Sequence, residues 1–170
     1  METSVLVSTT SFYLISRVFG KTMFIQSISD TSRKILNKIE TGIYHNNDDV
    51  ENMYIDTDIV VTINTLQLLV NEINNFNYSS TLNTALNNLN SIIIEIHDLI
   101  QLIEEKTNNH KQKYISIIRN VNLYREIKLV IKKNNILEKR LNLLIKVLQI
   151  NRYNEKDVNS NNDRRIILYR

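Results

Sequence analysis

The strongest pattern in the chain is a row of seven aliphatic residues between Ser80 and Lys106. Successive members are separated by alternating steps of four and three residues, and no Gly or Pro interrupts the row. Its members are Leu82, Leu86, Leu89, Ile93, Ile96, Ile100 and Ile103. On an α-helix this spacing places all these side chains on one face, so the pattern predicts a helix about 40 Å long. An apolar face of that length has to be covered by other helices.

A row with the same spacing lies just before it and predicts a helix from Ile59 to about Phe76, with its N-cap in the polar run 56–58. Its members are Ile59, Ile63, Leu66, Val70 and Ile73. The β-branched residues 60–62 would also suit a strand, but the row continues beyond them and no partner strand is visible. Only the link 77–79 precedes the N-cap expected at Ser80, so the two helices should be antiparallel neighbours.

The N-terminal segment predicts an amphipathic first helix within residues 1–28. Its apolar face would consist of residues at helical steps of three and four, namely Phe12, Ile15, Phe19 and Met23. This face fits packing onto the bundle core, and it also fits contact with a membrane surface, in which case these residues would face the membrane. The segment begins with Glu2 instead of basic residues, and its uncharged run is short. We therefore expect neither a signal peptide nor a transmembrane helix.

Polar residues mark the limits of the remaining elements. Asp30 or Thr31 is expected to cap a second helix over 32–41, and the polar, acidic stretch 43–57 is expected to be a loop. The long helix is expected to end at 107–109.

The next helix is expected over 110–132. Its apolar face would contain Tyr114, Ile117, Ile118, Val121, Tyr124, Ile127 and Ile131. Asn134-Asn135 should weaken or break the helix before a last one over 136–150. That last helix would bury Leu137, Leu141, Leu144 and Leu148.

Together these patterns predict an all-α fold, an up-and-down bundle of four to six helices around the long helix 80–106. The chain has no Pro and two Gly, whereas sheets joined by tight turns need both residue types. Residues 1–150 are expected to form one domain, from which the helix within 1–28 can separate. Residues 151–170 are expected to form a polar, basic and flexible tail.

The charges are divided unevenly along the chain. Residues 1–105 contain 5 Lys and Arg against 13 Asp and Glu, whereas residues 106–150 contain 11 Lys and Arg against only Glu126 and Glu138. Two explanations fit this division. Either the acidic half folds back onto the basic half, or the basic segment presents a face to the phosphate groups of lipid or nucleic acid.

The candidate residues for binding an anionic partner are cations of this basic segment. They are Lys111, Lys113, Arg119, Arg125, Lys128, Lys132, Lys133, Lys139 and Arg140. A helix corner at Asn134-Asn135 would gather four of them, 132–133 and 139–140, into one cluster. Contacts between such a cluster and phosphate would be sensitive to salt and independent of base sequence. An ordinary solvated helix face would have the same composition.

No motif in the sequence indicates catalytic or metal chemistry. His45, His97 and His110 have no ligand partners at helical spacing, and the chain has no Cys. There is no G-x-S-x-G and no Gly-rich phosphate loop, and the acidic run 48–51 lacks the spacing of an EF-hand. We therefore expect no enzyme activity and no cofactor.

Three short segments carry a resemblance. They are Ser-Arg-Val-Phe-Gly-Lys-Thr-Met-Phe (16–24), Asp56-x-Asp58-x4-Ile63 and Lys139-Arg140-Leu141-x-Leu143-Leu144-Ile145-Lys146. Together with the heavy use of Asn, Ile, Lys and Tyr, they resemble small all-helical proteins of giant, AT-rich DNA viruses. That resemblance implies a viral protein in the host cytoplasm, with no known activity.

A second likeness is to a structural class. The segment from Ile59 to Ile150, which includes Ile96-His97-Asp98-Leu99-Ile100, is similar in its helix lengths and acidic-to-basic order to four-helix, membrane-perturbing domains. These are the HeLo and mixed-lineage-kinase-like domains and their plant counterparts. The likeness implies a bundle that binds anionic lipid through scattered Lys and Arg.

Three functions stay open after this comparison. The leading hypothesis is a non-catalytic helical interaction or structural protein, which binds a protein partner or associates with itself through its long apolar row. The alternative is a peripheral membrane-binding or membrane-perturbing bundle that uses a basic face. The third is weak, nonspecific nucleic-acid binding. No small-molecule substrate is inferred.

Overall fold

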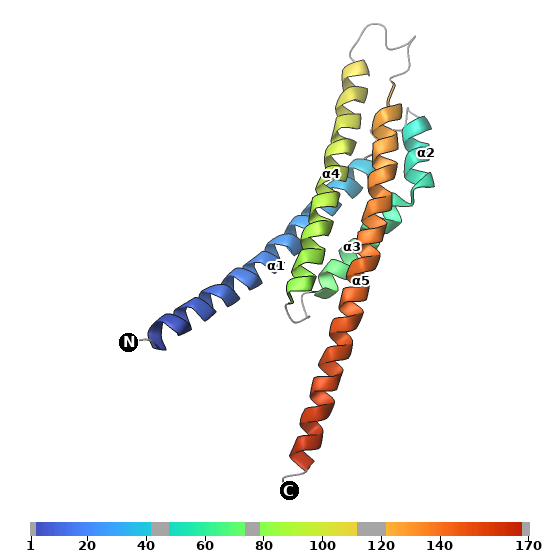
Figure 1. Ribbon diagram of the computed structural model, residues 1–170. Coiled ribbons are helices and arrows are strands. Elements are labelled where there is room, and N and C mark those ends of the chain that lie inside the picture. The colour runs from blue at the N-terminus through green and yellow to red at the C-terminus, as the bar shows by residue number, and fades with distance from the viewer. Residues whose placement is uncertain (1–2, 42–47, 74–78, 112–121, 168–170) are drawn as a thin grey trace.

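The computed structural model describes the backbone of residues 3–41, 48–73, 79–111 and 122–167, and the side chains of 22–41, 49–73, 79–110, 122–150 and 152–153. Within these ranges every regular element is an α-helix. The helices are α1 (Thr3–Glu40), α2 (Asp48–Asp56), α3 (Ile59–Ile73), α4 (Ser80–Lys111) and α5 (Tyr124–Ile167). Along the bundle α1 and α4 run one way, and α3 and α5 run the other way (Figure 1). The predicted all-α, up-and-down bundle is confirmed.

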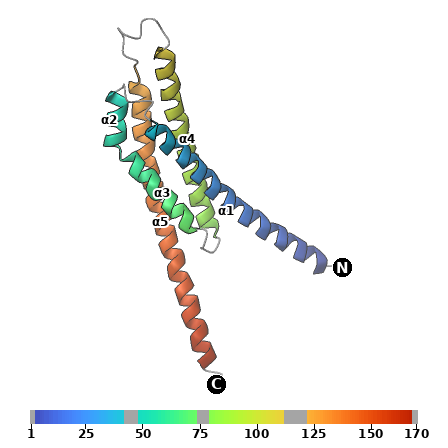
Figure 2. The ribbon, with the colours of Figure 1, turned by 180° about the vertical axis from the view of Figure 1, so that it is seen from behind.

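The central element is α4, which packs along α5 on one side and against α1 on the other (Figures 1 and 2). Every member of its predicted aliphatic row, from Leu82 to Ile103, is 0% exposed. The buried Thr107 continues the same face by one more turn, and its hydroxyl donates to the carbonyl oxygen of Ile103 at 2.8 Å. Neighbouring helices of the same chain therefore cover the row, as predicted.

The predicted row of α3 is buried as well. Ile59, Ile63, Leu66, Val70 and Ile73 have no exposed surface. Residues 60–62 are helical, so the strand alternative is wrong. The described part of the helix ends at Ile73, and its predicted continuation to Phe76 lies outside the described residues. The N-cap of α4 is Ser79, one residue earlier than predicted, because its Oγ accepts the Leu82 N–H at 3.1 Å.

One continuous helix, α1, replaces the two that the sequence predicted on either side of Asp30 and Thr31. Buried residues recur across this point at helical spacing: Ile25, Ile28, Ser32, Ile35 and Leu36. Contact with α3 and α4 thus continues through the predicted boundary. A residue suited to capping does not end a helix whose buried face continues past it.

The prediction of a loop over 43–57 is wrong in its second half, because residues 48–56 form the helix α2. This helix buries Val50, Met53 and Tyr54 and contacts α3 and α5. The Thr57 hydroxyl donates to the Met53 carbonyl oxygen at 2.6 Å, and Asp58 follows with a φ of 47°. This corner bends the chain by 48° between α2 and α3.

The sequence placed the end of the long helix and the limits of the last helices incorrectly. Residues 107–109 lie inside α4, which runs to Lys111. α5 passes through Asn134-Asn135 without a break. Its predicted core residues at 137, 141, 144 and 148 are buried, whereas Tyr124 is 71% exposed and Ile131 is also exposed. Tyr114, Ile117, Ile118 and Val121 lie outside the described residues.

Polar contacts set the alignment of α4 against α5. Lys106 pairs with Glu126, Glu95 pairs with Lys133, and the Asn88 carbonyl oxygen accepts a hydrogen bond from Arg140. Residue numbers fall along α4 as they rise along α5, so the two helices are antiparallel. On the other side of α4, Glu104 pairs with Lys38 of α1.

Both ends of the described chain extend beyond the bundle. The N-terminal part of α1 and the C-terminal part of α5 point away from the other helices in different directions (Figures 1 and 2). Phe12, Ile15 and Phe19 belong to the part of α1 whose side chains are not described, and Met23 is 67% exposed. α5 stays helical through the predicted tail as far as Ile167, and the flexibility of that tail stays a prediction.

Candidate functional site

The side of α5 that faces away from the core forms a long exposed surface, which we call the outer strip. Its charged and large apolar members are all exposed, and the exposed amides Asn135, Asn142 and Gln149 lie among them: Tyr124, Arg125, Lys128, Ile131, Lys132, Lys139, Leu143, Lys146, Ile150 and Tyr153. At 100° per residue they fall within a sector of about 120° around the helix axis. The buried side is made by Glu126, Val130, Asn134, Leu137, Leu141, Leu144 and Leu148. The outer strip is therefore not needed to close the core.

Cations and large apolar side chains share this strip, and carboxylates are missing from it. Between positions 124 and 153, α5 contains only two carboxylates, Glu126 and Glu138. Glu126 is 6% exposed and faces α4, while Glu138 accepts a hydrogen bond from Asn134 at 2.9 Å. The strip is thus an amphipathic surface of one charge sign.

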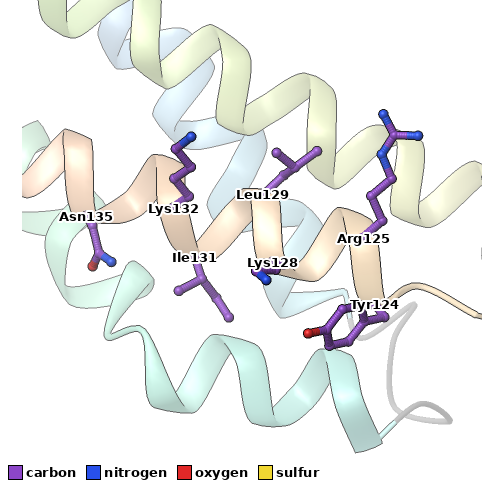
Figure 3. A pocket seen from close by; sticks show the side chains of 7 residues that line it. All are labelled: Tyr124, Arg125, Lys128, Leu129, Ile131, Lys132 and Asn135. Atoms are coloured by element: carbon purple, nitrogen blue, oxygen red, sulfur yellow. The ribbon is translucent and has the colours of Figure 1, made fainter.

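A pocket of 570 Å³ opens on the N-terminal part of the strip (Figure 3). It is lined by Tyr124, Arg125, Lys128, Leu129, Ile131, Lys132 and Asn135. In Figure 3, Tyr124 and Ile131 project toward the side of α2, whereas Arg125 and Lys132 project toward the side of α4. Lys128 Nζ lies 5.8 Å from the centroid of the Tyr124 ring, which is a cation–π distance. The pocket therefore combines apolar walls with three cations.

Two of the predicted binding cations face the bundle. Lys133 forms its ion pair with Glu95, and Arg140 donates Nη1 to the Asn88 carbonyl oxygen. Both side chains are half-buried and hold α5 against α4. Because α5 has no break, the predicted corner with four clustered cations does not exist. Lys132 and Lys139, the sequence neighbours of these two residues, lie on the outer strip.

The other predicted binding cations divide into two groups. Arg125, Lys128, Lys132 and Lys139 are exposed and form no ion pair with a carboxylate among the described residues. Lys111 ends α4 and its side chain is not described, while Lys113 and Arg119 lie outside the described residues. The acidic half thus neutralises part of the basic segment, and the outer strip keeps its charge.

Sequence analysis missed the apolar members of the strip. It placed Tyr124 and Ile131 on a core face and did not single out Leu143, Ile150 or Tyr153. A row with helical steps of four, four and three residues through Glu126, Val130, Asn134 and Leu137 would have identified the buried side, but two of its members are polar. A search for apolar residues alone passes over such a row.

Glu126 and Lys106 form a separate polar contact at the inner edge of α5. Lys106 Nζ donates to Glu126 Oε1 at 2.6 Å, and the lysine side chain is 43% exposed while the carboxylate is nearly covered. This hydrogen bond holds the pKa of Glu126 below its ordinary value of 4.5, against the opposing effect of burial. The pair therefore joins α4 to α5 and has no net charge.

The described residues contain no cluster of three or more His, Asp and Glu side chains that could hold a metal ion. His97 Nδ1 lies 3.2 Å from Asp98 Oδ1, the side chain of its neighbour in the sequence. The Asp98 side chain is 69% exposed, and its freedom in solvent lets it bend back toward the ring.

In the described parts of the chain, no single helix has the length and apolar content needed to cross a membrane. One bent pair, Asp49–Asp56 with Ile59–Ile73, meets the length and composition requirement.

Comparison of the chain with protein-family models, with curated proteins and with solved structures finds no match. The resemblances to giant-virus proteins and to membrane-perturbing four-helix domains stay predictions.

Proposed function

We propose that this is a non-catalytic helical interaction protein whose binding surface is the outer strip of α5. One observation carries the proposal: unpaired cations and large exposed apolar side chains share one helix face that carries no carboxylate. From Tyr124 to Tyr153 this face is about 44 Å long. Contiguous exposed apolar surface with a polar border is characteristic of interaction sites.

The buried aliphatic row of α4 does not serve as this surface. Each of its seven side chains is fully covered by helices of the same chain. A second copy of the protein, or any other partner, must therefore contact residues outside the core. Among the helices with described side chains, α5 is the one that combines such apolar residues with several unpaired cations.

The two sides of α5 have different tasks in this proposal. The inner side completes the core through Val130, Leu137 and Leu144, which are 0% exposed. The outer strip makes no comparable contact. Substitutions on it should leave the bundle folded, so that a loss of binding can be separated from a loss of structure.

The test places a photo-crosslinking amino acid at Ile131 or at Leu143, in cells that express the full chain. Matched controls carry it at Val61 or Leu68, which are exposed aliphatic positions on α3. We expect adducts from the strip positions several times more abundant than from the controls, whatever the chemical class of the adduct. Equal or absent adducts at the strip, with helical content unchanged by circular dichroism, would reject the proposed function.

A further inference from the structure

We infer that the partner of the outer strip is the headgroup region of an anionic lipid bilayer. This inference rests on the proposed function, because it names the partner of the same surface. It is carried by the arrangement of apolar side chains, by the charge of the strip and by its place on the molecule.

The apolar side chains form two groups along the strip. Tyr124 and Ile131 occupy the N-terminal end, and Leu143, Ile150 and Tyr153 occupy the C-terminal end. A helix that lies in the plane of a bilayer surface inserts such side chains at the boundary between headgroups and acyl chains. Tyrosine suits this depth because its ring is apolar while its hydroxyl reaches water.

The charges of the strip match lipid phosphate. Its five cations face no carboxylate on the same surface, and Lys132 and Lys139 lie between the two apolar groups, with Lys146 inside the C-terminal one. Long lysine side chains extend from a partly inserted helix to the headgroups while their methylene groups cover apolar surface. Near an anionic leaflet each such cation strengthens binding about fivefold.

The position of α5 also favours an extended, deformable partner. The helix lies in front of α3 in Figure 1 and behind it in Figure 2, and the side chains of its outer strip are exposed. An exposed helix face of about 44 Å can lie along a membrane plane. Nucleic acid would use the cations and leave the five apolar side chains in water, which gives those residues no part in binding.

The experiment is flotation of the full chain with two kinds of vesicle, one of phosphatidylcholine alone and one that also contains about 30% phosphatidylserine, at low and high salt. We expect binding to the anionic vesicles only, weakened but not abolished at high salt because the apolar contacts persist. Equal binding to both vesicles, or binding to neither, would overturn the inference.

Two double variants test the two components of the surface. K128Q/K132Q should weaken binding to anionic vesicles about 25-fold, since each charge contributes about fivefold. I131S/L143S should weaken it at least about tenfold and make the remaining binding fully reversible by salt.

Each variant has a matched control on another helix. R33Q/K34Q removes two exposed cations of α1, and V61S/L68S removes two exposed apolar residues of α3. Both controls should bind within about twofold of the unmodified chain. Full binding by I131S/L143S, or a loss as large in the controls, would overturn the inference.

A gel-shift series with duplex DNA separates nucleic acid from lipid. A shift at low salt without vesicle binding would overturn the lipid partner. Adducts from Ile131 and Leu143 to protein, together with no vesicle binding, would reject the lipid inference and leave the proposed function standing. The absence of both adducts and vesicle binding would reject both.

Discussion

Asn134 of α5 donates from Nδ2 to the carbonyl oxygen of Thr57 at 2.8 Å, and thereby joins the last helix to the corner between α2 and α3. The same nitrogen donates to Glu138 Oε1 at 2.9 Å, and the asparagine is 0% exposed. Its Oδ1 has no partner among the described residues. A residue that the sequence suggested as a helix breaker thus fixes the turn of another part of the chain.

Replacing Asn134 with Ala should lower the free energy of unfolding by about 2 kcal/mol. The partly buried Thr57 carbonyl oxygen loses its donor and a small cavity opens, while removal of the unpaired Oδ1 offsets part of the cost. Urea denaturation measures the change. Asn135→Ala, at the exposed neighbouring position, should change stability by less than about 0.5 kcal/mol. Similar values for the two variants would contradict the assigned role of Asn134.

Truncation of the α4 row should be far more costly than truncation of the same residue type outside it. Leu89 is 0% exposed and Leu102 is 39% exposed on the same helix. Leu89→Ala should destabilise the protein by about 2–5 kcal/mol through lost burial and a cavity, and Leu102→Ala by less than about 1 kcal/mol. Thermal or urea unfolding of both variants provides the comparison. A small effect at Leu89 would show that the row is not the centre of the core.

The Glu126–Lys106 contact should contribute stability that depends on pH. The folded-state pKa of Glu126 is lower than its unfolded value of 4.5, so the contribution is complete above pH 4.5. Below pH 4.5 the unfolded chain binds the proton before the folded chain does, so the contribution to stability decreases as the pH falls. It is completely lost once the pH lies below the folded-state pKa. At neutral pH, Glu126→Gln should cost about 1 kcal/mol, a low value because solvent screens Lys106.

Urea unfolding at a series of pH values measures this contribution as the difference between the original chain and Glu126→Gln. The difference should shrink as the pH falls below 4.5. Glu105→Gln serves as the control, since this exposed carboxylate accepts the Gln101 amide of its own helix. A difference for Glu126→Gln that stays constant with pH would contradict the ion pair.

Because the backbone at Asp58 is left-handed, protein stability should depend on which residue type occupies this position. With a φ of 47°, a β-branched residue is strained, so Asp58→Val should destabilise the protein by about 1–2 kcal/mol. Asp58→Gly should be tolerated within about 0.5 kcal/mol, because Gly adopts this conformation freely. Asp56→Val, in the last turn of α2, should cost less than about 0.7 kcal/mol. Thermal unfolding distinguishes the three, and equal stability of the two Val variants would argue against a strained corner.

The sequence pattern was sufficient to identify the buried residues of a helix where all of them are apolar. The rows of α3 and α4 contain only aliphatic residues at regular steps, and both were identified residue by residue. The buried side of α5 includes Glu126 and Asn134, so hydrophobic periodicity selected Tyr124 and Ile131 in their place. The polar composition of residues 48–56 also led to the prediction of a loop in place of α2. The contacts of this helix with α3 and α5 depend on three core residues, Val50, Met53 and Tyr54.

The candidate site depended on information that the sequence does not carry locally. Lys132 and Lys133 are neighbours in a basic run, yet one lies on the outer strip and the other pairs with Glu95. Which of them faces outward is decided by how α5 is rotated against α4. That rotation follows from long-range packing, so composition revealed the excess of positive charge without revealing where it lies.

The three polar links between α4 and α5 have a consequence for folding specificity. Two long helices with similar aliphatic seams can associate at several axial offsets that differ by whole turns, each of which buries comparable area. A slide of one turn, about 5.4 Å, would leave the Glu126 carboxylate enclosed without its ammonium partner and would separate Lys133 from Glu95 and Arg140 from Asn88. Hydrophobic burial holds the two helices together, and the three polar contacts select one axial offset among those that hydrophobic burial alone would allow.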